Sequence, residues 1–242
     1  MSFFKKFRDA QRPYCAALVP AAGSSSRMGA AGNKLLLTLG GQPVLAWTLQ
    51  ALDRSSGIDE IVVAAREEDF LPFMELCRTY GIAKPVRIVR GGATRAESVL
   101  CAALEVAGKA KLLAVHDGDR PLATPELIDR VVARAAQCAA AAPAVSVKDT
   151  VKEIRGEVVV HTLNRSVLRA IQTPQVFSAD LLKAALQSAL QSGAPITDDC
   201  SAVERLGKVV YLTEGSEENL KITTPLDLCL AEAILTEREA RT

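Results

Sequence analysis

The chain has 242 residues, of which 49% are hydrophobic and 24% charged, as in a globular protein of one large domain or two small ones. Its 29 Lys and Arg nearly balance its 28 Asp and Glu, and the formal net charge of +1 argues against a broad nucleic-acid or anionic-membrane surface. Aromatic residues make up only 4%, which argues against a stacking platform for single strands. We therefore expect neither nucleic acid nor membrane as a partner.

The first residues and the cysteines point to the same kind of compartment. Residues 1–13 are interrupted by Lys5, Lys6 and Arg8, so they lack the apolar centre of a signal peptide, and we interpret them as a short polar N-terminal arm. No run approaches the roughly 18 apolar residues of a membrane span. The six cysteines are far apart and form no Cys-x-x-Cys pair. This predicts buried or half-buried thiols in a reducing, cytoplasmic setting rather than a zinc site or a disulfide framework.

Short apolar runs alternate with helical patterns through the first part of the chain. The runs lie at residues 15–22, 61–65, 86–89, 112–115 and 144–147. Unbroken runs of this length are typical of strands buried on both faces of a parallel sheet. Helices are predicted at residues 43–53, 67–80, 93–107 and 125–140, and the alanines at 139–142 are interpreted as a helix end. The alternation predicts an α/β protein with a doubly wound, mostly parallel sheet.

After residue 147 the pattern changes. Residues 150–154 and 157–162 are rich in β-formers around a turn at 155–156, which predicts a hairpin that leaves the main sheet. We interpret residues 14–240 as a single domain with an inserted β-arm at about 148–172. The remaining predicted elements are an extended piece at 173–177, helices at 179–191 and 201–206, a strand at 209–213 and a closing helix at 225–239.

The first predicted strand leads into Pro-Ala-Ala-Gly-Ser-Ser-Ser-Arg-Met-Gly at residues 20–29. Gly23 and the serines allow backbone amides to approach phosphates closely, and Arg27 and Lys34 add two cations. Such a loop suits a triphosphate whose charge must be stabilised as it shifts. Neither the Walker A pattern nor the G-x-G-x-x-G fingerprint is present. From these residues alone, a strand–helix connection with solvated charges on an exposed loop remains the alternative.

A second glycine loop follows the third predicted strand, with the sequence Gly-Gly-Ala-Thr-Arg-Ala-Glu-Ser at residues 91–98. Its two glycines would let a flat base or ribose lie against the backbone, with Arg95 and Ser98 contacting polar groups. A helix start capped by Thr94 explains the same residues nearly as well.

The fourth predicted strand ends in His-Asp-Gly-Asp-Arg-Pro at residues 116–121. A carboxylate at the carboxyl end of a parallel strand lies where open α/β sheets bind ligands, so Asp117 is a candidate Mg²⁺ ligand on a polyphosphate. We interpret His116 as an orienting or core histidine. The only other histidine is distant and no G-x-S-x-G occurs, so a Ser/His/Asp hydrolase has little support.

In combination, these segments resemble the 2-C-methyl-D-erythritol 4-phosphate cytidylyltransferase family from about residue 16 to about residue 235. The order and spacing of the matching pieces are highly specific. They are Pro-Ala-Ala-Gly…Arg-Met with the following Lys34, Gly-Gly…Arg-Ala-Glu-Ser-Val, His-Asp-x-x-Arg-Pro, Asp-Thr, Asn-Arg, Thr-Pro-Gln, Ile-Thr-Asp and Asn-x-Lys-Ile-Thr-x-Pro-x-Asp.

The resemblance implies a Rossmann-like nucleotidyltransferase that moves CMP from CTP to the polyol phosphate with Mg²⁺ as cofactor and releases diphosphate. It assigns Arg27 and Lys34 to catalysis and Asp117 to the metal. The implied nucleotide-binding residues are Ala21, Ala22, Gly23, Gly92, Arg95, Ser98 and Asp117. The implied residues for the phosphate substrate are Asp117, Arg120, Thr150, Arg165, Thr173, Thr197 and Lys221. It also implies a homodimer in which the arm carries Thr150 and Arg165 into the partner's site.

The chain departs from the family pattern at two places. Asn33-Lys34-Leu35 replaces the frequent Pro-Lys-Gln, which bears on the rigidity of the loop. Gly118-Asp119 replaces a frequent pair of alanines and adds a carboxylate close to the metal position. Two hypotheses follow for Asp119: a solvated turn residue that pairs weakly with Arg120 or Arg95, or a second carboxylate near Mg²⁺.

Two other functions remain in view. A ribitol-5-phosphate cytidylyltransferase shares the fold and most motifs, but the Ala21-Ala22 pair favours methylerythritol because the ribitol group more often has a glycine there. A non-catalytic nucleotide-binding regulator is the other alternative, and the presence of Arg27, Lys34 and Asp117 weighs against it.

Overall fold

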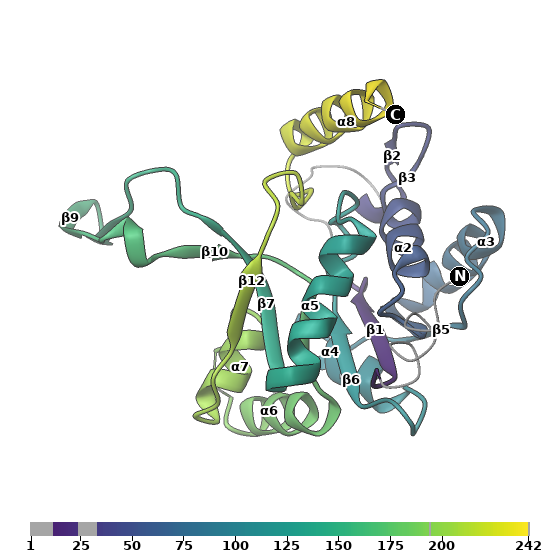
Figure 1. Cartoon of the computed structure of the whole chain (residues 1–242), viewed down its shortest axis with the longest axis horizontal. Helices are drawn as coiled ribbons and strands as arrows, with labels where there is room; N and C mark the ends of the chain where they lie inside the picture. Colours follow the sequence, from purple (N-terminus) through teal and green to yellow (C-terminus); the bar gives the residue numbers. More distant parts are fainter. Residues whose placement is uncertain (1–11, 24–32, 194, 242) are drawn as a thin grey trace, which may run out of the picture.

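The computed structural model describes residues 12–23, 33–193 and 195–241. Its centre is a mixed sheet of eight strands among these residues, in the order β10-β7-β11-β6-β1-β4-β5, with β12 paired to β7 (Figure 1). The strands are β1 (Cys15–Pro20), β4 (Glu60–Ala65), β5 (Val86–Arg90), β6 (Leu112–Val115), β7 (Ala140–Ser146), β10 (Arg169–Ile171), β11 (Gln175–Ser178) and β12 (Tyr211–Glu214). The predicted α/β class with a mostly parallel sheet is confirmed.

The order of the strands places a ligand-binding edge in the middle of the sheet. Strands β6, β1, β4 and β5 run parallel, with Leu18 opposite Val62 on one side and Val115 on the other. The chain builds outward from β1 to β4 and β5, then returns to place β6 on the other side of β1. The carboxyl ends of β1 and β6 therefore meet where the winding reverses, which is where open α/β sheets bind ligands.

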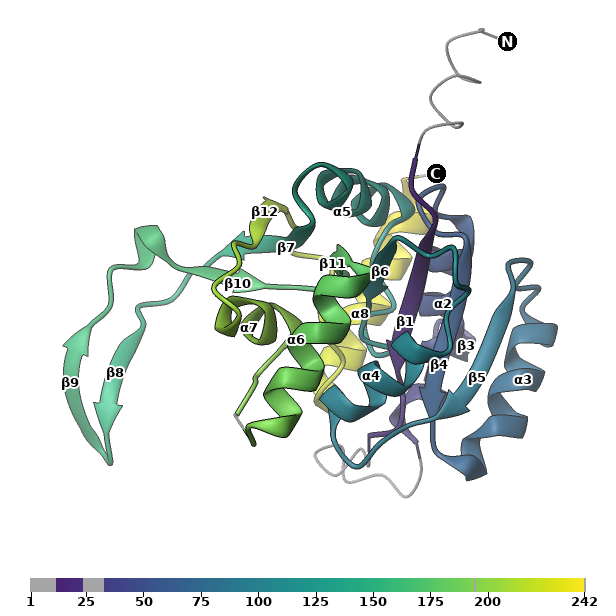
Figure 2. The same cartoon turned by 90° about the horizontal axis from the view of Figure 1, so that it is seen from below.

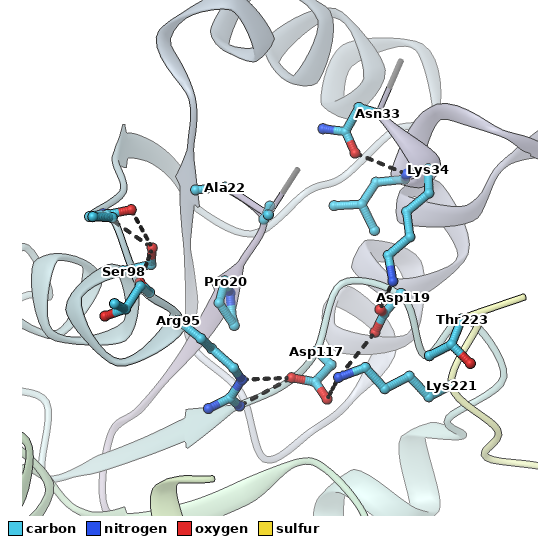
Figure 3. A pocket seen from close by; sticks show the side chains of 16 residues that line it. Pro20, Ala22, Asn33, Lys34, Arg95, Ser98, Asp117, Asp119, Lys221 and Thr223 are labelled. Atoms are coloured by element: carbon cyan, nitrogen blue, oxygen red, sulfur yellow. Dashed lines mark hydrogen bonds and ion pairs between the residues drawn. The ribbon is translucent and has the colours of Figure 1, made fainter. Parts of the chain in front are cut away.

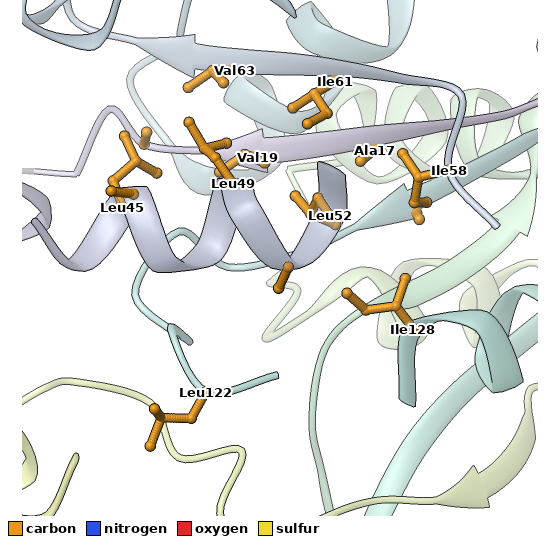
Figure 4. Close-up of a cluster of buried hydrophobic side chains, with 14 of the residues drawn as sticks. Ala17, Val19, Leu45, Leu49, Leu52, Ile58, Ile61, Val63, Leu122 and Ile128 are labelled. Carbon is orange, nitrogen blue, oxygen red and sulfur yellow. The ribbon is translucent and has the colours of Figure 1, made fainter. Parts of the chain in front are cut away.

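Helices cover both faces of the sheet. Side chains alternate along β1, so Ala17 and Val19 pack on one face while Ala16 and Leu18 pack on the other. The first face, part of which Figure 4 shows, is covered by α2 (Val44–Arg54), α3 (Phe70–Thr79), α5 (Pro125–Cys138) and α8 (Pro225–Ala240). The second is covered by α4 (Arg95–Leu104), α6 (Ala179–Gln191) and α7 (Asp199–Arg205). Burial on both faces explains why the strands read as unbroken apolar runs.

The predicted hairpin is present as β8 (Lys152–Arg155) and β9 (Val158–Thr162), which project away from the body (Figures 1 and 2). Every residue of both strands is exposed. The turn lies at residues 156–157, one position later than predicted. The 3-10 helix η4 (Arg165–Val167) follows, and β10 then joins the main sheet beside β7.

Several element boundaries differ from the prediction. Helix α5 ends at Cys138, Ala139 takes a left-handed φ of 65°, and β7 starts at once, so the interpretation of 139–142 as a helix end is wrong. Alanine favours helices, but pairing of β7 with β11 and β12 overrides that preference. The predicted helix at 67–80 begins as the 3-10 helix η3 (Glu67–Asp69). The short hairpin β2 (Thr38–Leu39) and β3 (Gln42–Pro43) was not predicted.

The remaining expectations concern the N-terminal arm, the cysteines and membranes. Only residues 12 and 13 of the arm are described, and Arg12 forms an ion pair of 2.7 Å with Asp59. All six cysteines are free thiols, but Cys229 is exposed, contrary to the prediction of buried or half-buried thiols. Within the described ranges, no helix combines the length and apolar character needed to cross a membrane.

We predict that Ala139→Gly stabilises the protein by about 0.5–1 kcal/mol, because relief of the left-handed conformation outweighs the added entropy of the unfolded chain. Ala133→Gly, an exposed position inside α5, is the matched control and should destabilise by about 1 kcal/mol. Urea unfolding at equal protein concentration measures both. A loss at position 139 as large as that at 133 would contradict the conformational argument.

Candidate active site

A pocket of about 310 Å³ opens at the carboxyl ends of β1 and β6 (Figure 3). All seven predicted nucleotide-binding residues line this pocket, although they come from three separate segments of the chain. Its lining consists of Pro20, Ala21, Ala22, Gly23, Asn33, Lys34, Leu35, Gly92, Ala93, Thr94, Arg95, Ser98, Asp117, Asp119, Lys221 and Thr223. The predicted catalytic residue Arg27 lies outside the described residues.

Asp117 is the centre of charge in this pocket. One carboxylate oxygen, Oδ1, accepts a hydrogen bond of 3.1 Å from Arg95, and Oδ2 accepts one of 2.9 Å from Lys221. Arg120 Nε lies 3.7 Å from Oδ2. Burial alone would raise the pKa of Asp117, but the cations led by Arg95 and Lys221 outweigh it and hold that pKa well below its usual range. The carboxylate is therefore ionised and fixed in direction.

Arg95 is held between two buried carboxylates. It is the first residue of α4, and its Nη1 lies 2.8 Å from Asp199, which is only 1% exposed. Burial would lower the pKa of Arg95, but Asp199 and Asp117 outweigh it and raise that pKa. The guanidinium is thus a permanent cation at the pocket wall with little freedom to turn.

The second glycine loop is shaped by Ser98. The Gly92 N–H donates to Ser98 Oγ over 3.1 Å, and the hydroxyl donates to the carbonyl of Thr94 over 2.9 Å. A Cβ at position 92 would lie 2.2 Å from the Cβ of Glu97, so this close approach requires glycine. Thr94 and Glu97 form a capping box, which confirms the helix-start interpretation. The same loop also lines the pocket.

Lys34 is not on an exposed loop, so the alternative of a solvated surface charge is wrong for this residue. It begins the 3-10 helix η2 (Lys34–Leu36), and its side chain is only 17% exposed. Its ammonium donates to Asp119 Oδ2 over 2.5 Å and to the carbonyl of Ile222 over 3.0 Å. A predicted catalytic cation therefore lies inside the pocket wall.

Asn33 anchors the turn that carries Lys34. Its Oδ1 accepts from the Leu35 N–H over 3.0 Å, which caps η2. Its Nδ2 donates over 2.9 Å to Asp69, a buried carboxylate that also accepts from Arg66 Nε over 2.9 Å. Asn33, which stands where the family frequently has proline, thus ties this turn to η3 through side-chain hydrogen bonds.

Asp119 does not behave as a solvated turn residue, and that hypothesis is wrong. It is only 6% exposed, and its ion pair is with Lys34 rather than with Arg120 or Arg95. Lys221 lies 4.0 Å from its other oxygen, Oδ1.

The other predicted substrate residues lie outside the pocket lining. Arg120 is turned inward and donates to the carbonyl of Asn219 over 2.7 Å. Thr173 is buried and its hydroxyl accepts from the Asp117 N–H over 3.1 Å, so it supports the pocket from behind. Thr197 is exposed beside a neighbouring hollow that Thr94 and Arg95 also line.

Thr150 and Arg165 lie on the exposed arm. His116 is fully buried and its Nδ1 lies 3.0 Å from the Thr173 hydroxyl. Burial lowers the pKa of His116 to about 4, so it is neutral near pH 7 and suits the predicted orienting or core role.

Sequence reasoning did not assign roles to Asp199 or Asn33, both of which shape the site. Asp199 directly follows the matched piece Ile-Thr-Asp at residues 196–198, and no spacing in the sequence links it to Arg95. Asn33 was marked only as a departure from a pattern. Its amide could pair with either a backbone or a distant side chain, and the sequence does not choose between these.

The carboxylates of the pocket fit a divalent cation that arrives with a polyphosphate. No group of three or more His, Cys, Asp or Glu in the described part of the chain is arranged to hold a metal alone. Asp117 and Asp119 both line the pocket, so its donor set offers carboxylate oxygens to a cation. One or two carboxylates completed by substrate phosphates and water is the usual arrangement for Mg²⁺.

The reversal of the strand order brings two glycine loops and the cations of Lys34, Arg95 and Lys221 to one pocket, an arrangement suited to binding the phosphates of a nucleotide. A family model described as 2-C-methyl-D-erythritol 4-phosphate cytidylyltransferase matches residues 15–237. The chain belongs to this family.

Individual relatives agree with the family match. A 2-C-methyl-D-erythritol 4-phosphate cytidylyltransferase of Synechococcus sp. (strain JA-3-3Ab) is 46% identical over 227 residues, covering 91% of this chain and 97% of the relative. One from Bacillus cytotoxicus is 44% identical and covers 90% and 96%. The crystal structure of 4-diphosphocytidyl-2C-methyl-D-erythritol synthase from Anaerococcus prevotii superposes with a TM-score of 0.82 at 32% identity, covering 93% and 99%.

We predict that Asn33→Ala destabilises the protein by about 2 kcal/mol, because it removes a helix cap and leaves the buried Asp69 short of a donor. Asn164→Ala is the matched control, since Asn164 caps η4 in the same way on the exposed arm. It should change stability by less than about 0.5 kcal/mol. Chemical denaturation measures both, and equal effects would show that the link to Asp69 adds nothing.

Proposed function

We propose that this chain transfers CMP from CTP to 2-C-methyl-D-erythritol 4-phosphate. The products are 4-diphosphocytidyl-2-C-methyl-D-erythritol and diphosphate, in non-mevalonate isoprenoid biosynthesis. The observation that carries the proposal is the convergence of Lys34, Arg95 and Lys221 around Asp117 and Asp119 in one pocket. The cytoplasmic location expected from composition and cysteines stays a prediction.

The reaction is an in-line displacement at phosphorus. A phosphate oxygen of the polyol substrate forms a bond to the α-phosphorus of CTP, and the bond between that phosphorus and the bridging oxygen to the β-phosphate breaks. The electron pair leaves with diphosphate. No general base is required because the attacking phosphate is already ionised near pH 7. Both reactants are anions, so positioning and cations supply most of the acceleration.

The pocket supports a division of labour among its residues. Lys34, with Arg27, would stabilise the charge on the transferring phosphoryl group. The loop at 91–98 and residues 21–23 would bind cytidine, with backbone groups reading the edge of the base. Lys221 would hold the polyol phosphate, with Thr173 and Arg120 supporting Asp117 from behind. Mg²⁺ would be held by Asp117 together with triphosphate oxygens, and it would neutralise charge on them.

The arm supports a homodimeric active site. Ile154 on β8, Val158 on β9 and Val167 on η4 are 63%, 69% and 75% exposed, so the arm presents apolar side chains that its own chain leaves uncovered. The arm projects away from the body of its own chain (Figure 2), and its predicted substrate residues Thr150 and Arg165 do not line the pocket. A second copy would cover the apolar side chains and receive both residues beside its own Lys221.

We expect diphosphate release with CTP, Mg²⁺ and 2-C-methyl-D-erythritol 4-phosphate, and much slower release with UTP or ATP. The reason is that the glycine loop presents fixed backbone groups to the base. An enzyme-coupled diphosphate assay with each nucleotide measures this. Ribitol 5-phosphate as the preferred acceptor would establish the alternative transferase, and nucleotide binding without turnover of either acceptor would establish the regulator. Equal turnover with UTP would contradict the assignment of the base site.

Subunit mixing tests the shared site. Lys34→Ala should lower kcat by about 10²–10³, as for loss of one transition-state donor. Arg165→Ala should raise KM for the polyol phosphate far more than KM for CTP, because a guanidinium pairs with phosphate through two hydrogen bonds. Assayed at low polyol phosphate, the mixed variants should regain activity because each heterodimer keeps one intact site. Each variant alone is the control, and no recovery in confirmed heterodimers would place the whole site in one chain.

A further inference from the structure

We infer that Asp119 is a positioning residue for Lys34, which fixes the lysine ammonium at the wall of the nucleotide pocket. The catalytic part of this role rests on the proposed cytidylyl transfer, whereas the contact itself does not. The competing role for Asp119 is that of a metal ligand, which would raise the Mg²⁺ requirement when Asp119 is replaced.

The geometry of the contact is a closed ring through three distant segments. The Lys34 ammonium donates to Asp119 Oδ2 over 2.5 Å and to the Ile222 carbonyl over 3.0 Å. The Ile222 N–H in turn donates to the backbone carbonyl of Asp119 over 2.8 Å. Ile222 is fully buried. The Lys34 ammonium is therefore bound to two segments, at Asp119 and at Ile222, that are also hydrogen-bonded to each other. Figure 3 shows the Lys34–Asp119 pair.

The loop that carries Asp119 is itself held in place. The carbonyl of Gly118 accepts a hydrogen bond of 2.9 Å from the Thr48 hydroxyl on α2. A Cβ at position 118 would lie 3.3 Å from side-chain carbons of Leu35 and Val19, so the loop packs directly against η2 and β1. Leu35 is the neighbour of Lys34 on η2. Backbone packing and the ion pair thus fix the same short helix relative to the same loop.

The carboxylate of Asp119 faces the lysine more than the solvent of the pocket. Its side chain is 9% exposed and that of Lys34 is 17% exposed, so water screens this pair little. Oδ2 is taken by Lys34, and Oδ1 has an accessible surface below 1 Å². A lysine side chain has several rotatable bonds, and fixing them costs conformational entropy. Because Asp119 already restricts the Lys34 side chain, less entropy is lost when the triphosphate binds.

The test combines kinetics with a labelling measurement that needs no substrate. The variants are Asp119→Ala, the residue more frequent in the family, and Asp119→Asn, which keeps the shape and removes the charge. Asp129→Ala is the matched control. Asp129 lies on α5, and its carboxylate accepts hydrogen bonds from the hydroxyls of Ser55 and Ser56, which follow the last residue of α2. Circular dichroism establishes folding, and Asp119→Asn carries the test if Asp119→Ala does not fold.

We expect Asp119→Ala to lower kcat roughly tenfold, within the usual range of coupling between contacting groups, while KM for CTP changes by less than about threefold. In a Lys34→Ala background the same substitution should cost less than about twofold, because the group through which Asp119 acts is gone. The Mg²⁺ concentration for half-maximal rate should not move. Additive losses in the double variant, or a raised Mg²⁺ requirement that persists without Lys34, would overturn the proposal in favour of a metal role.

Acetylation followed by mass spectrometry reports on the contact directly. Lys34 should label slowly relative to the exposed Lys208, and faster by at least about threefold in Asp119→Ala and Asp119→Asn, but not in Asp129→Ala. Unchanged labelling of Lys34 would overturn the proposal whatever the kinetics show. Because labelling uses no CTP or acceptor, a failure of the proposed function leaves this result standing and distinguishable.

Discussion

The carboxylate of Asp117 is the fixed charge on which the arrangement of the pocket depends. It lies just beyond β6, and its backbone N–H is held by Thr173 while its side chain orders Arg95 and Lys221. These cations come from segments far apart in sequence, and without a shared anion they would repel one another across a small cavity. The sheet topology brings the segments to one edge, and the buried carboxylate converts that proximity into a defined geometry.

In such a pocket the charged side chains are already held in place before a ligand binds. Each lysine or arginine of the described lining is paired with a carboxylate, so the pocket does not carry bare repelling cations. A triphosphate or its metal ion would exchange partners with these pairs rather than meet solvated side chains. Such exchange costs little reorganisation, which is the condition under which fixed charges are effective in catalysis.

The sequence predicts those features of the site whose contacting residues lie close together along the chain, and it misses those whose contacting residues lie far apart. Local sequence patterns predict the elements that depend on neighbours a few positions away. Examples are the helices at 44–54 and 179–191 and the glycine loop with its helix cap. The Lys34–Asp119 pair joins residues 85 positions apart, and the Lys34 contact with Ile222 spans 188. No local pattern encodes such pairs. The error at Ala139 has the opposite cause: a strong local preference for helix gives way to pairing within the sheet.

The tight packing at Gly118 has a consequence for how this chain can change over evolutionary time. A methyl group there would press on Leu35 and Val19, while Asp119 next to it binds the lysine that Leu35 adjoins. The effects of substitution at 118 and 119 are therefore tied to each other through η2. A lineage moving towards the double-alanine pattern of the family would pass through intermediates in which one position is changed and the other is not. The effect of changing either position on the Lys34 contact is therefore expected to depend on which residue stands at the other.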